Sequence, residues 1–323
     1  MNKWTSVLVL FTLLFSSCEK EEIPVAKHTI GETESIEVAI GNYYSSQVWF
    51  NIENGTEVAR NNKTDWDLAF ENNEPGWRIT MNTANFSSIA RTNKTDITAI
   101  TDTIGNTWST DECSGNLDST GIGNWKKGTG IYILNRGKDE QGKHLGFTKF
   151  LIDSVTDQNF YFRYATLNET DWTSAKITKD NNYLFSYFSL RDKKQVQIAP
   201  PTKDWDLLFS QYTHIFHDMT PAATYLVTGV LLNPQSTYSA KVFDKTFEEI
   251  TSNDISELNT NNRIDNIGYD WKSYNINKGY YTTNIFKSYV LKSQSEKLYK
   301  IHFLDWYNDQ GEKGVFNIEY SEL

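Results

Sequence analysis

The chain alternates apolar and polar residues from Ser35 onward, and this period of two indicates half-buried β-strands. Val38 and Ile40 form one such set, and residues 48–52 form the next. Asn54-Gly55 follows directly and predicts a hairpin turn, because both residue types tolerate a positive φ. Further strands of the first half are predicted at residues 77–82, 131–134, 147–155 and 160–165. The pattern therefore predicts an all-β first half.

The second half repeats this order of strands. Apolar or alternating segments occur at residues 183–190, 225–232, 289–291, 299–306 and 315–320. Residues 102–130 are rich in Gly, Ser, Thr and Asp and are predicted to be loop. Helical periodicity is nearly absent, and residues 247–258 are the best candidate for a helix.

One phrase occurs twice, as Asp65-Trp66-Asp67-Leu68-Ala69-Phe70 and as Asp204-Trp205-Asp206-Leu207-Leu208-Phe209. The strands that close each half also resemble each other, with Lys149 in the first half and Lys300 in the second. These repeats predict two related antiparallel β modules, at residues 35–170 and 178–323. The predicted fold class is accordingly all-β.

The N-terminus predicts a lipoprotein. Residues 1–17 combine Lys3 with a short apolar run and read as a signal peptide, and Cys18 ends a segment that resembles a lipobox. The alternative is a plain secretory signal with an incidental Cys. Residues 18–34 are polar and predict a tether, and their acidic start resembles the export signal of surface-exposed Bacteroidetes lipoproteins. We expect attachment to the outer membrane through acyl chains on Cys18, with the protein facing the medium.

The net charge and the cysteine content restrict which partners and which covalent links the protein can have. The net charge is -10, which excludes a nucleic-acid backbone as a partner. Removal of the signal peptide leaves Cys113 as the last thiol, so the modules must hold together without an internal disulfide. No apolar run is long enough for a spanning helix, so contact with the membrane is expected through the lipid only.

The repeated phrase is most simply structural. Trp66 and Trp205 lie two positions before a Leu, so each is expected to share a strand face with the core. Asp67 and Asp206 are then expected to face solvent or to cap a turn. For two carboxylates at this spacing to act in catalysis, one of them would need a raised pKa and a place in a cleft. Since no catalytic motif is visible either, the sequence predicts a binding protein rather than an enzyme.

The histidines suggest a ligand. His28 lies in the tether, His144 lies in a polar loop, and His302 shares a strand face with Lys300 and is expected to be exposed. His214, His217 and Met219 fall within one short aromatic stretch, and these residue types suit haem iron and a porphyrin ring. On an extended strand His217 and Met219 would share a face that His214 opposes, so the stretch would supply one axial ligand. The alternative is a hairpin that binds nothing.

The chain resembles the HmuY-like lipoproteins of Bacteroidetes. The resemblance rests on the two Trp-Asp-Leu phrases, on residues 225–233, and on residues 299–308 with Gly311-Glu312-Lys313-Gly314, and it is stronger in the second half. It implies a surface-anchored, all-β haemophore that passes haem to a TonB-dependent outer-membrane receptor. The family's haem ligands lie outside the matching phrases, so the donors named above come from chemistry alone. The tandem arrangement departs from the single-domain members.

Two other functions stay open. The protein could bind glycans or proteins at the surface, with a Trp stacking on a sugar ring. The candidates for that role are Trp77, Trp108, Trp125 and Trp271. It could also be a structural module of a receptor complex, with no ligand of its own.

Overall fold

The computed structural model describes residues 31–257 and 263–323, without the side chains of residues 255–257. The predicted signal peptide at residues 1–17, Cys18, His28 and most of the tether lie outside the described residues. The fold is all-β with antiparallel strands, as predicted. Within the described ranges no helix is long and apolar enough to cross a membrane.

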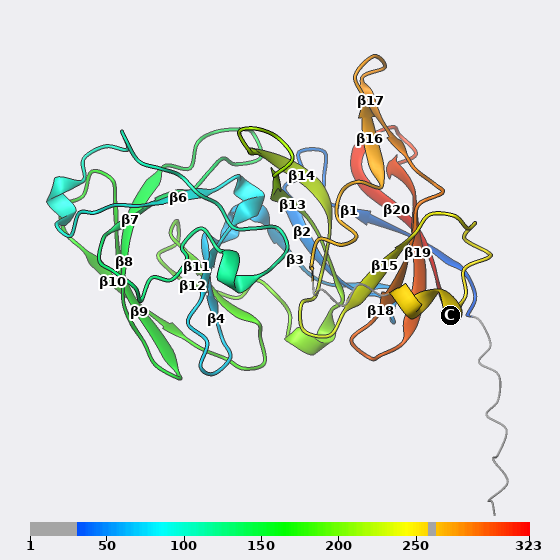
Figure 1. Cartoon of the computed structure of the whole chain (residues 1–323), viewed down its shortest axis with the longest axis horizontal. Coiled ribbons are helices and arrows are strands. Elements are labelled where there is room, and N and C mark those ends of the chain that lie inside the picture. Colours follow the sequence, from blue (N-terminus) through cyan, green and yellow to red (C-terminus); the bar gives the residue numbers. More distant parts are fainter. Residues whose placement is uncertain (1–30, 258–262) are drawn as a thin grey trace, which may run out of the picture.

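The strands form two β-sandwiches that lie side by side along the long axis (Figure 1). The first sandwich pairs a five-stranded with a four-stranded sheet. The order of the larger sheet is β10 (Thr173–Thr178), β9 (Asn159–Thr166), β8 (Phe147–Val155), β7 (Tyr132–Asn135) and β6 (Ser88–Arg91). The order of the smaller sheet is β12 (Lys194–Val196), β11 (Phe185–Ser189), β4 (Leu68–Glu71) and β5 (Ile79–Met81).

The second sandwich has the same plan. Its five-stranded sheet runs β1 (Glu34–Ala39), β20 (Lys313–Glu322), β19 (Leu298–Tyr307), β18 (Ser288–Lys292) and β15 (Tyr238–Val242). Its four-stranded sheet runs β14 (Ala223–Leu232), β13 (Leu207–Phe216), β2 (Ser46–Asn51) and β3 (Thr56–Asn62). Strands β1, β2 and β3 therefore belong to the second sandwich although they begin the chain.

This arrangement is an exchange of equivalent segments between the two repeats. Strands β10, β11 and β12 precede the second Trp-Asp-Leu phrase, yet they complete the first sandwich. Strands β1, β2 and β3 precede the first phrase, yet they complete the second sandwich. The predicted modules at 35–170 and 178–323 describe the repeat in sequence, whereas each sandwich takes three of its strands from outside the module that supplies the others.

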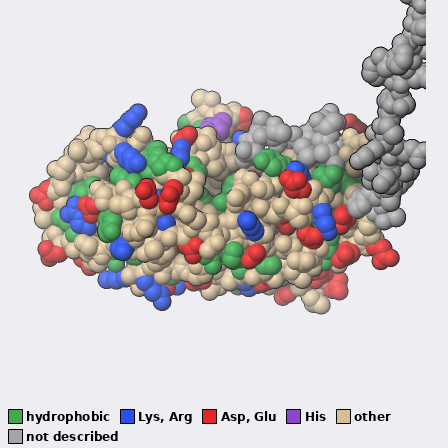
Figure 2. All heavy atoms as spheres, turned by 90° about the horizontal axis from the view of Figure 1, so that it is seen from below, with side chains coloured by type: hydrophobic (Ala, Val, Ile, Leu, Met, Phe, Trp, Pro, Cys, Tyr) green, Lys and Arg blue, Asp and Glu red, His purple; other side chains and the backbone are tan. Residues whose placement is uncertain are grey.

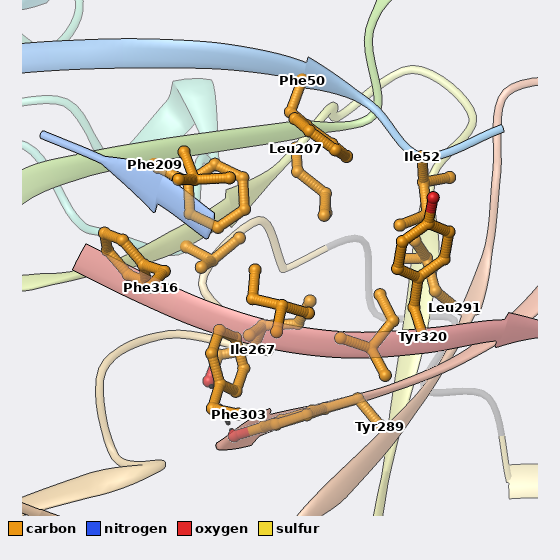
Figure 3. Packing of buried hydrophobic residues seen from close by; sticks show 14 of the residues in the cluster. Phe50, Ile52, Leu207, Phe209, Ile267, Tyr289, Leu291, Phe303, Phe316 and Tyr320 are labelled. Atoms are coloured by element: carbon orange, nitrogen blue, oxygen red, sulfur yellow. Dashed lines mark hydrogen bonds between the residues drawn. The ribbon is translucent and has the colours of Figure 1, made fainter. Parts of the chain in front are cut away.

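Packing in the core of the second sandwich explains why the exchanged strands stay bound to it. Phe50 and Ile52 point into the same cluster as Leu207, Phe209 and Tyr320 (Figure 3). Phe50 and Phe209 meet edge to face, with 5.9 Å between ring centroids. These residues belong to the continuous, almost fully buried core of the second sandwich, so removing β2 would expose its apolar side chains to water.

Most predicted strands are present, with small shifts at their ends. Residues 102–130 form loop with one 3₁₀ turn at Leu117–Ser119, close to the prediction. The predicted helix at 247–258 is replaced, in its described part, by an irregular stretch and a 3₁₀ helix at Ser252–Glu257. An additional hairpin of β16 (Lys272–Asn275) and β17 (Tyr280–Thr283) projects from the second sandwich (Figure 1).

Candidate functional site

The repeated phrase lies where the two sandwiches meet. In each copy a 3₁₀ turn, at Lys63–Asp65 or Thr202–Asp204, ends at the Trp, and the strand begins two residues later. A bend at the intervening Asp breaks the alternation. As a result Leu68 and Leu207 enter the sandwich cores, while Trp66 and Trp205 join a separate cluster between the sandwiches. The prediction that each Trp shares the core face was wrong for this reason.

Asp67 and Asp206 are buried, at 3% and 1% exposure, so the expectation that they face solvent was wrong. Each instead accepts the backbone N–H of a turn residue, which agrees with the alternative that they cap a turn. Asp206 accepts the backbone N–H of Ile52 at 3.0 Å and of Gln294 at 2.7 Å. Ile52 directly follows β2, so this carboxylate fastens the exchanged strand to the phrase of the other repeat. Burial is the main cause that raises the pKa of Asp206, and these two N–H bonds oppose it.

Asp67 does the same for the first sandwich. It accepts the backbone N–H of Leu190, directly after β11, at 2.7 Å. Its other oxygen lies 2.7 Å from Nε of Arg136. Burial raises the pKa of Asp67, and the guanidinium of Arg136 works against that rise. Both signature carboxylates thus stabilise the packing of the exchanged strands and are not candidates for catalysis.

A pocket of about 720 Å³ lies between the four-stranded sheets of the two sandwiches. Its aromatic walls pair across strands: Trp49 meets Trp205 at 4.7 Å and Trp66 meets Tyr187 at 5.0 Å, both edge to face. Pockets of roughly 300–1,000 Å³ with such walls are typical small-molecule sites. The lining contains acidic groups, Glu71, Glu74, Asp111 and Glu112, and the described residues place no Lys or Arg in it.

Asp111 is one of the two buried acids of this lining, with 6% of its surface exposed. Its two oxygens accept the backbone N–H of Met81 and of Gly121, both at 2.7 Å. Burial nevertheless raises the pKa of Asp111 to about 7. Its hydrogen bonds hold the loop that continues to Glu112 and Cys113 against β5.

The predicted donors His214 and His217 do not line this pocket but contact residues that do. Strand β13 pairs with β2 only over residues 207–209, and its far half continues across the first sandwich, where Thr213 donates to the Thr83 carbonyl. His214 Nδ1 lies 3.2 Å from Sγ of Cys113, and His217 Nε2 lies 2.9 Å from Oε1 of Glu112. Glu112 and Cys113 line the pocket, so each imidazole lies one side chain away from it. Figure 2 shows His side chains on one face, near the middle of the long axis.

The expected opposition of the two imidazoles was wrong. Strand β13 ends at Phe216, so His217 and Met219 lie in the turn that follows and do not continue the alternation. Both imidazoles contact the same loop of the first sandwich, at residues 112–113. Met219 lies in the turn between β13 and β14 with 53% of its surface exposed.

His214 is part of a compact group of polar side chains. Cys113 Sγ donates to Oδ2 of Asp265 at 3.1 Å, and Arg263 lies 2.8 Å from the same oxygen. The ring of His214 meets Tyr269 at 5.1 Å. Burial lowers the pKa of His214, and burial together with Asp265 raises that of Cys113 to about 12. Neutral imidazole and thiol are the forms these surroundings favour.

Sequence reasoning missed Glu112, Cys113 and Asp265. They lie in loops without periodicity, and the only available signal was that Cys113 is the last thiol after removal of the signal peptide. Ligand atoms of Cys113, His214 and Asp265 lie within 4.8 Å of one another, so this group could hold a metal ion.

The other histidines lie elsewhere. His302 was expected to be exposed but is 8% exposed, because Phe247 stacks on its ring at 4.2 Å. Its Nε2 lies 2.6 Å from Oε2 of Glu319. Lys300 is buried on the same face and donates to the Phe247 carbonyl. His144 is exposed, and its Nε2 contacts Asn135 in the first sandwich.

The tryptophans proposed for sugar stacking are not free. Trp271 is fully buried and stacks on Phe303 at 4.2 Å. Trp77, Trp108 and Trp125 are half-buried. Lys126 lies over the rings of both Trp77 and Trp125, so these rings already have a cation on their faces.

Comparison with known proteins supports the repeat. The HmuY protein family model matches the chain twice, at residues 43–185 and 180–320. The chain belongs to the HmuY family. The tandem predicted from the repeated phrase is thereby confirmed, and the family is one of ligand-binding proteins rather than enzymes. No curated protein matches the chain at a significant level.

Solved structures of HmuY-like proteins are also similar. The apo HmuY analogue (TFO) of Tannerella forsythia is 10% identical, covers 91% of this chain and 98% of its own, and gives a TM-score of 0.25. Apo PinO from Porphyromonas gingivitis is 9% identical, with 90% and 97% covered and a TM-score of 0.26. A Bacteroides vulgatus structure that carries the name of an HmuY-like heme binding protein is 9% identical, with 89% and 90% covered and a TM-score of 0.24.

Proposed function

We propose that the protein is a non-enzymatic haem carrier that binds haem in the pocket between its sandwiches. The observation that carries this is an aromatic pocket with two imidazoles, His214 and His217, that each contact a side chain lining it. Membership of the HmuY family supports it. Porphyrin faces pack well on aromatic walls, and iron takes imidazole nitrogen as an axial ligand.

His217 is the better placed axial ligand. Its side chain is 65% exposed and, among the described residues, hydrogen-bonds to Glu112, whereas His214 is engaged by Cys113. Met219 is exposed in the same turn and is a second donor within the chain. When bound, haem would supply the iron; the protein supplies the imidazole, the aromatic walls and the exclusion of water.

The charge of the lining predicts how haem would be oriented. Glu71, Glu74, Asp111 and Glu112 would repel the propionates of haem, which therefore must point to solvent. The porphyrin ring would occupy the apolar interior.

A hemin titration of residues 19–323 tests the proposal. We expect a shifted Soret band at one equivalent for the wild type. His217→Ala should change the position of the band and weaken binding, while His144→Ala, in an exposed loop of the first sandwich, should change neither. An unshifted band in the wild type would refute haem binding, and an unchanged spectrum in His217→Ala would remove His217 as a ligand.

We further propose that Cys18 carries lipid and that the protein faces the medium from the outer membrane. The signal-like segment at residues 1–17 and the acidic stretch after Cys18 support this. Cys18→Ser should abolish the incorporation of labelled fatty acid and release the protein from the membrane fraction. Protease added to intact cells should digest the wild type; protection from the protease would contradict surface exposure.

Transfer to a TonB-dependent outer-membrane receptor is part of the same proposal. Apolar side chains are exposed on and beside the projecting β16–β17 hairpin, which would suit a protein partner: Tyr274, Ile276, Tyr280, Ile285 and Phe286. Ile276→Asp should leave the hemin spectrum unchanged and abolish chemical crosslinking to the receptor in producing cells. Persistent crosslinking would show that the hairpin is not the contact.

The rival function, binding of glycans or proteins without haem, is favoured by the same exposed hairpin. A glycan array with residues 19–323 would separate the two. Binding of a glycan together with an unshifted Soret band would replace the haem proposal.

A further inference from the structure

We propose that Cys113, His214 and Asp265 form a zinc site that joins the two sandwiches beside the haem pocket. This goes beyond the haem proposal, because it uses a different metal and different ligand atoms. Cys113 Sγ lies 3.2 Å from His214 Nδ1 and 3.1 Å from Asp265 Oδ2. All three ligand atoms lie within 4.8 Å of one another.

These spacings are close to those of a tetrahedral zinc site. Bond lengths of about 2.3 Å to sulfur and about 2.0–2.2 Å to nitrogen and oxygen place ligand atoms roughly 3.4–3.6 Å apart. The two contacts of Cys113 Sγ are slightly shorter than this, and the His214 and Asp265 ligand atoms lie within 4.8 Å of each other, so small shifts of the side chains would admit the ion. Three protein ligands leave the fourth position to water or to an added ligand.

The donor set selects zinc among the common divalent ions. A thiolate and an imidazole are poor ligands for Mg²⁺ and Ca²⁺, which take oxygen, whereas zinc accepts sulfur, nitrogen and carboxylate oxygen together. Binding converts the Cys113 thiol to a thiolate, with its proton released to solvent. Burial and Asp265 keep that thiol protonated until a cation is present.

Buried polar atoms without hydrogen-bond partners among the described residues lie around the site. The side chain of Asp265 is 5% exposed, and its Oδ1 is buried without a hydrogen bond among the described residues. The hydroxyl of Tyr212, a residue that is 2% exposed, is likewise buried and without a partner. The Tyr212 hydroxyl lies beside the loop that carries Asp265, since a Cβ at Gly268 would lie 3.3 Å from it. Buried polar atoms without partners are costly, and an ion held by Asp265 would satisfy its Oδ1.

The fold brings the three ligands from separate segments. Cys113 comes from the loop of the first sandwich that Asp111 fixes, and His214 comes from the extended half of β13. Asp265 lies in a loop that presses on β14: a Cβ at Gly229 would lie 2.2 Å from the Gly268 carbonyl oxygen. The backbone N–H of Ile264 donates to the Ser114 carbonyl at 3.0 Å, so the two loops already meet. Zinc would therefore link the loops of the two sandwiches next to the pocket.

Metal binding can be measured without haem. Residues 19–323 contain every described strand and core cluster and one thiol, Cys113. The protein is stripped with a chelator and titrated with zinc chloride or cobalt(II) chloride. We expect one equivalent to bind, with thiolate-to-cobalt charge transfer in the near ultraviolet, and zinc should protect Cys113 from a thiol reagent.

Matched variants separate ligands from bystanders. Cys113→Ser and Asp265→Asn should each weaken zinc binding by more than about 100-fold, because changes outside the ligand shell already cost about 10–100-fold. His144→Ala should bind zinc as the wild type does. Zinc should raise the Tm of the wild type but not that of Cys113→Ser, since only a folded site gains from the ion.

Clear outcomes would overturn the site. Equal zinc affinity in wild type and Cys113→Ser would do so, as would unchanged thiol reactivity in saturating zinc. Circular dichroism during urea unfolding checks that Cys113→Ser still folds. Loss of zinc binding in a folded Cys113→Ser variant supports the zinc site whether or not the wild type binds hemin, and wild-type zinc affinity in that variant overturns the zinc site without touching the haem proposal.

Discussion

The two sandwiches share one strand plan but differ in the length of one hairpin. In the first sandwich β4 and β5 have 4 and 3 residues, whereas their counterparts β13 and β14 have 10 each. The extra length carries β13 past β2 and over the first sandwich, and it places His214 and His217 against residues 112–113. The two sandwiches thus share their strand plan. The candidate donors His214 and His217 come from the longer hairpin that only the second sandwich has.

The long connections between strands also carry different donors in the two sandwiches. The β6–β7 connection of the first sandwich carries Cys113, and the β15–β18 connection of the second carries Asp265. These connections hold equivalent positions in the two strand plans, and they meet where Ile264 bonds to Ser114. The site is therefore built where the two repeats face each other, from donors that neither repeat has alone.

The largest expected effect comes from cutting the chain along different boundaries. Residues 62–200 contain every strand of the first sandwich, so we expect this fragment to unfold cooperatively in urea. Residues 35–170 match the repeat in sequence but lack β11 and β12 and retain β2 without its partner β13. We expect that fragment to show no cooperative transition.

Circular dichroism during urea unfolding measures the difference. The control is residues 19–323, which should unfold cooperatively. Cooperative unfolding of residues 35–170, with no transition in residues 62–200, would show that β1, β2 and β3 pack on their own repeat and that the exchange is wrong.

A smaller effect compares the two signature carboxylates. Asp67→Ala would leave Arg136 uncompensated as well as the Leu190 N–H, and breaking a buried ion pair costs about 3–5 kcal/mol. Asp206→Ala would leave two backbone N–H groups without an acceptor, at about 1–3 kcal/mol for each unsatisfied group. Both variants should lower the free energy of unfolding, which urea titration measures.

The control for this pair is Asp204→Ala, since Asp204 is exposed in the same phrase. Its effect should stay within about 0.5 kcal/mol. Wild-type stability in both buried variants would contradict the fastening of β2 and β11 by these carboxylates.

The sequence could predict the strands and the repeat because both leave local patterns. Alternation marks each strand, and the doubled Trp-Asp-Leu phrase marks each repeat. Which sandwich a strand joins is not local: β2 and β11 hold equivalent places beside β13 and β4, and either sandwich offers a matching edge. The bend at Asp206, which turns Trp205 toward the pocket, leaves no trace in the alternation. Cys113 and Asp265 lie in irregular loops, so only the folded chain brings them to His214.

The smallest effect concerns a buried lysine that distinguishes the second sandwich. Lys272 lies 4.2 Å from the ring centroid of Trp271 and 4.4 Å from that of Trp306, and it donates one hydrogen bond, to the Thr228 carbonyl. Lys149 of the first sandwich donates to three carbonyls instead. Burial lowers the pKa of Lys272 to about 7.

This lowered pKa predicts how stability changes with pH. Above about pH 7 the folded protein holds Lys272 neutral, while the unfolded chain keeps the proton up to about pH 10.4. Since the unfolded state then binds more protons, the free energy of unfolding should rise with pH in this window, by at most about 1.4 kcal/mol per pH unit. Lys272→Met should remove this rise, and Lys194→Met, on exposed β12, should keep it. Urea titrations at several pH values give the difference between each variant and the wild type. Identical slopes in Lys272→Met and wild type would mean that Lys272 reaches water in the folded protein.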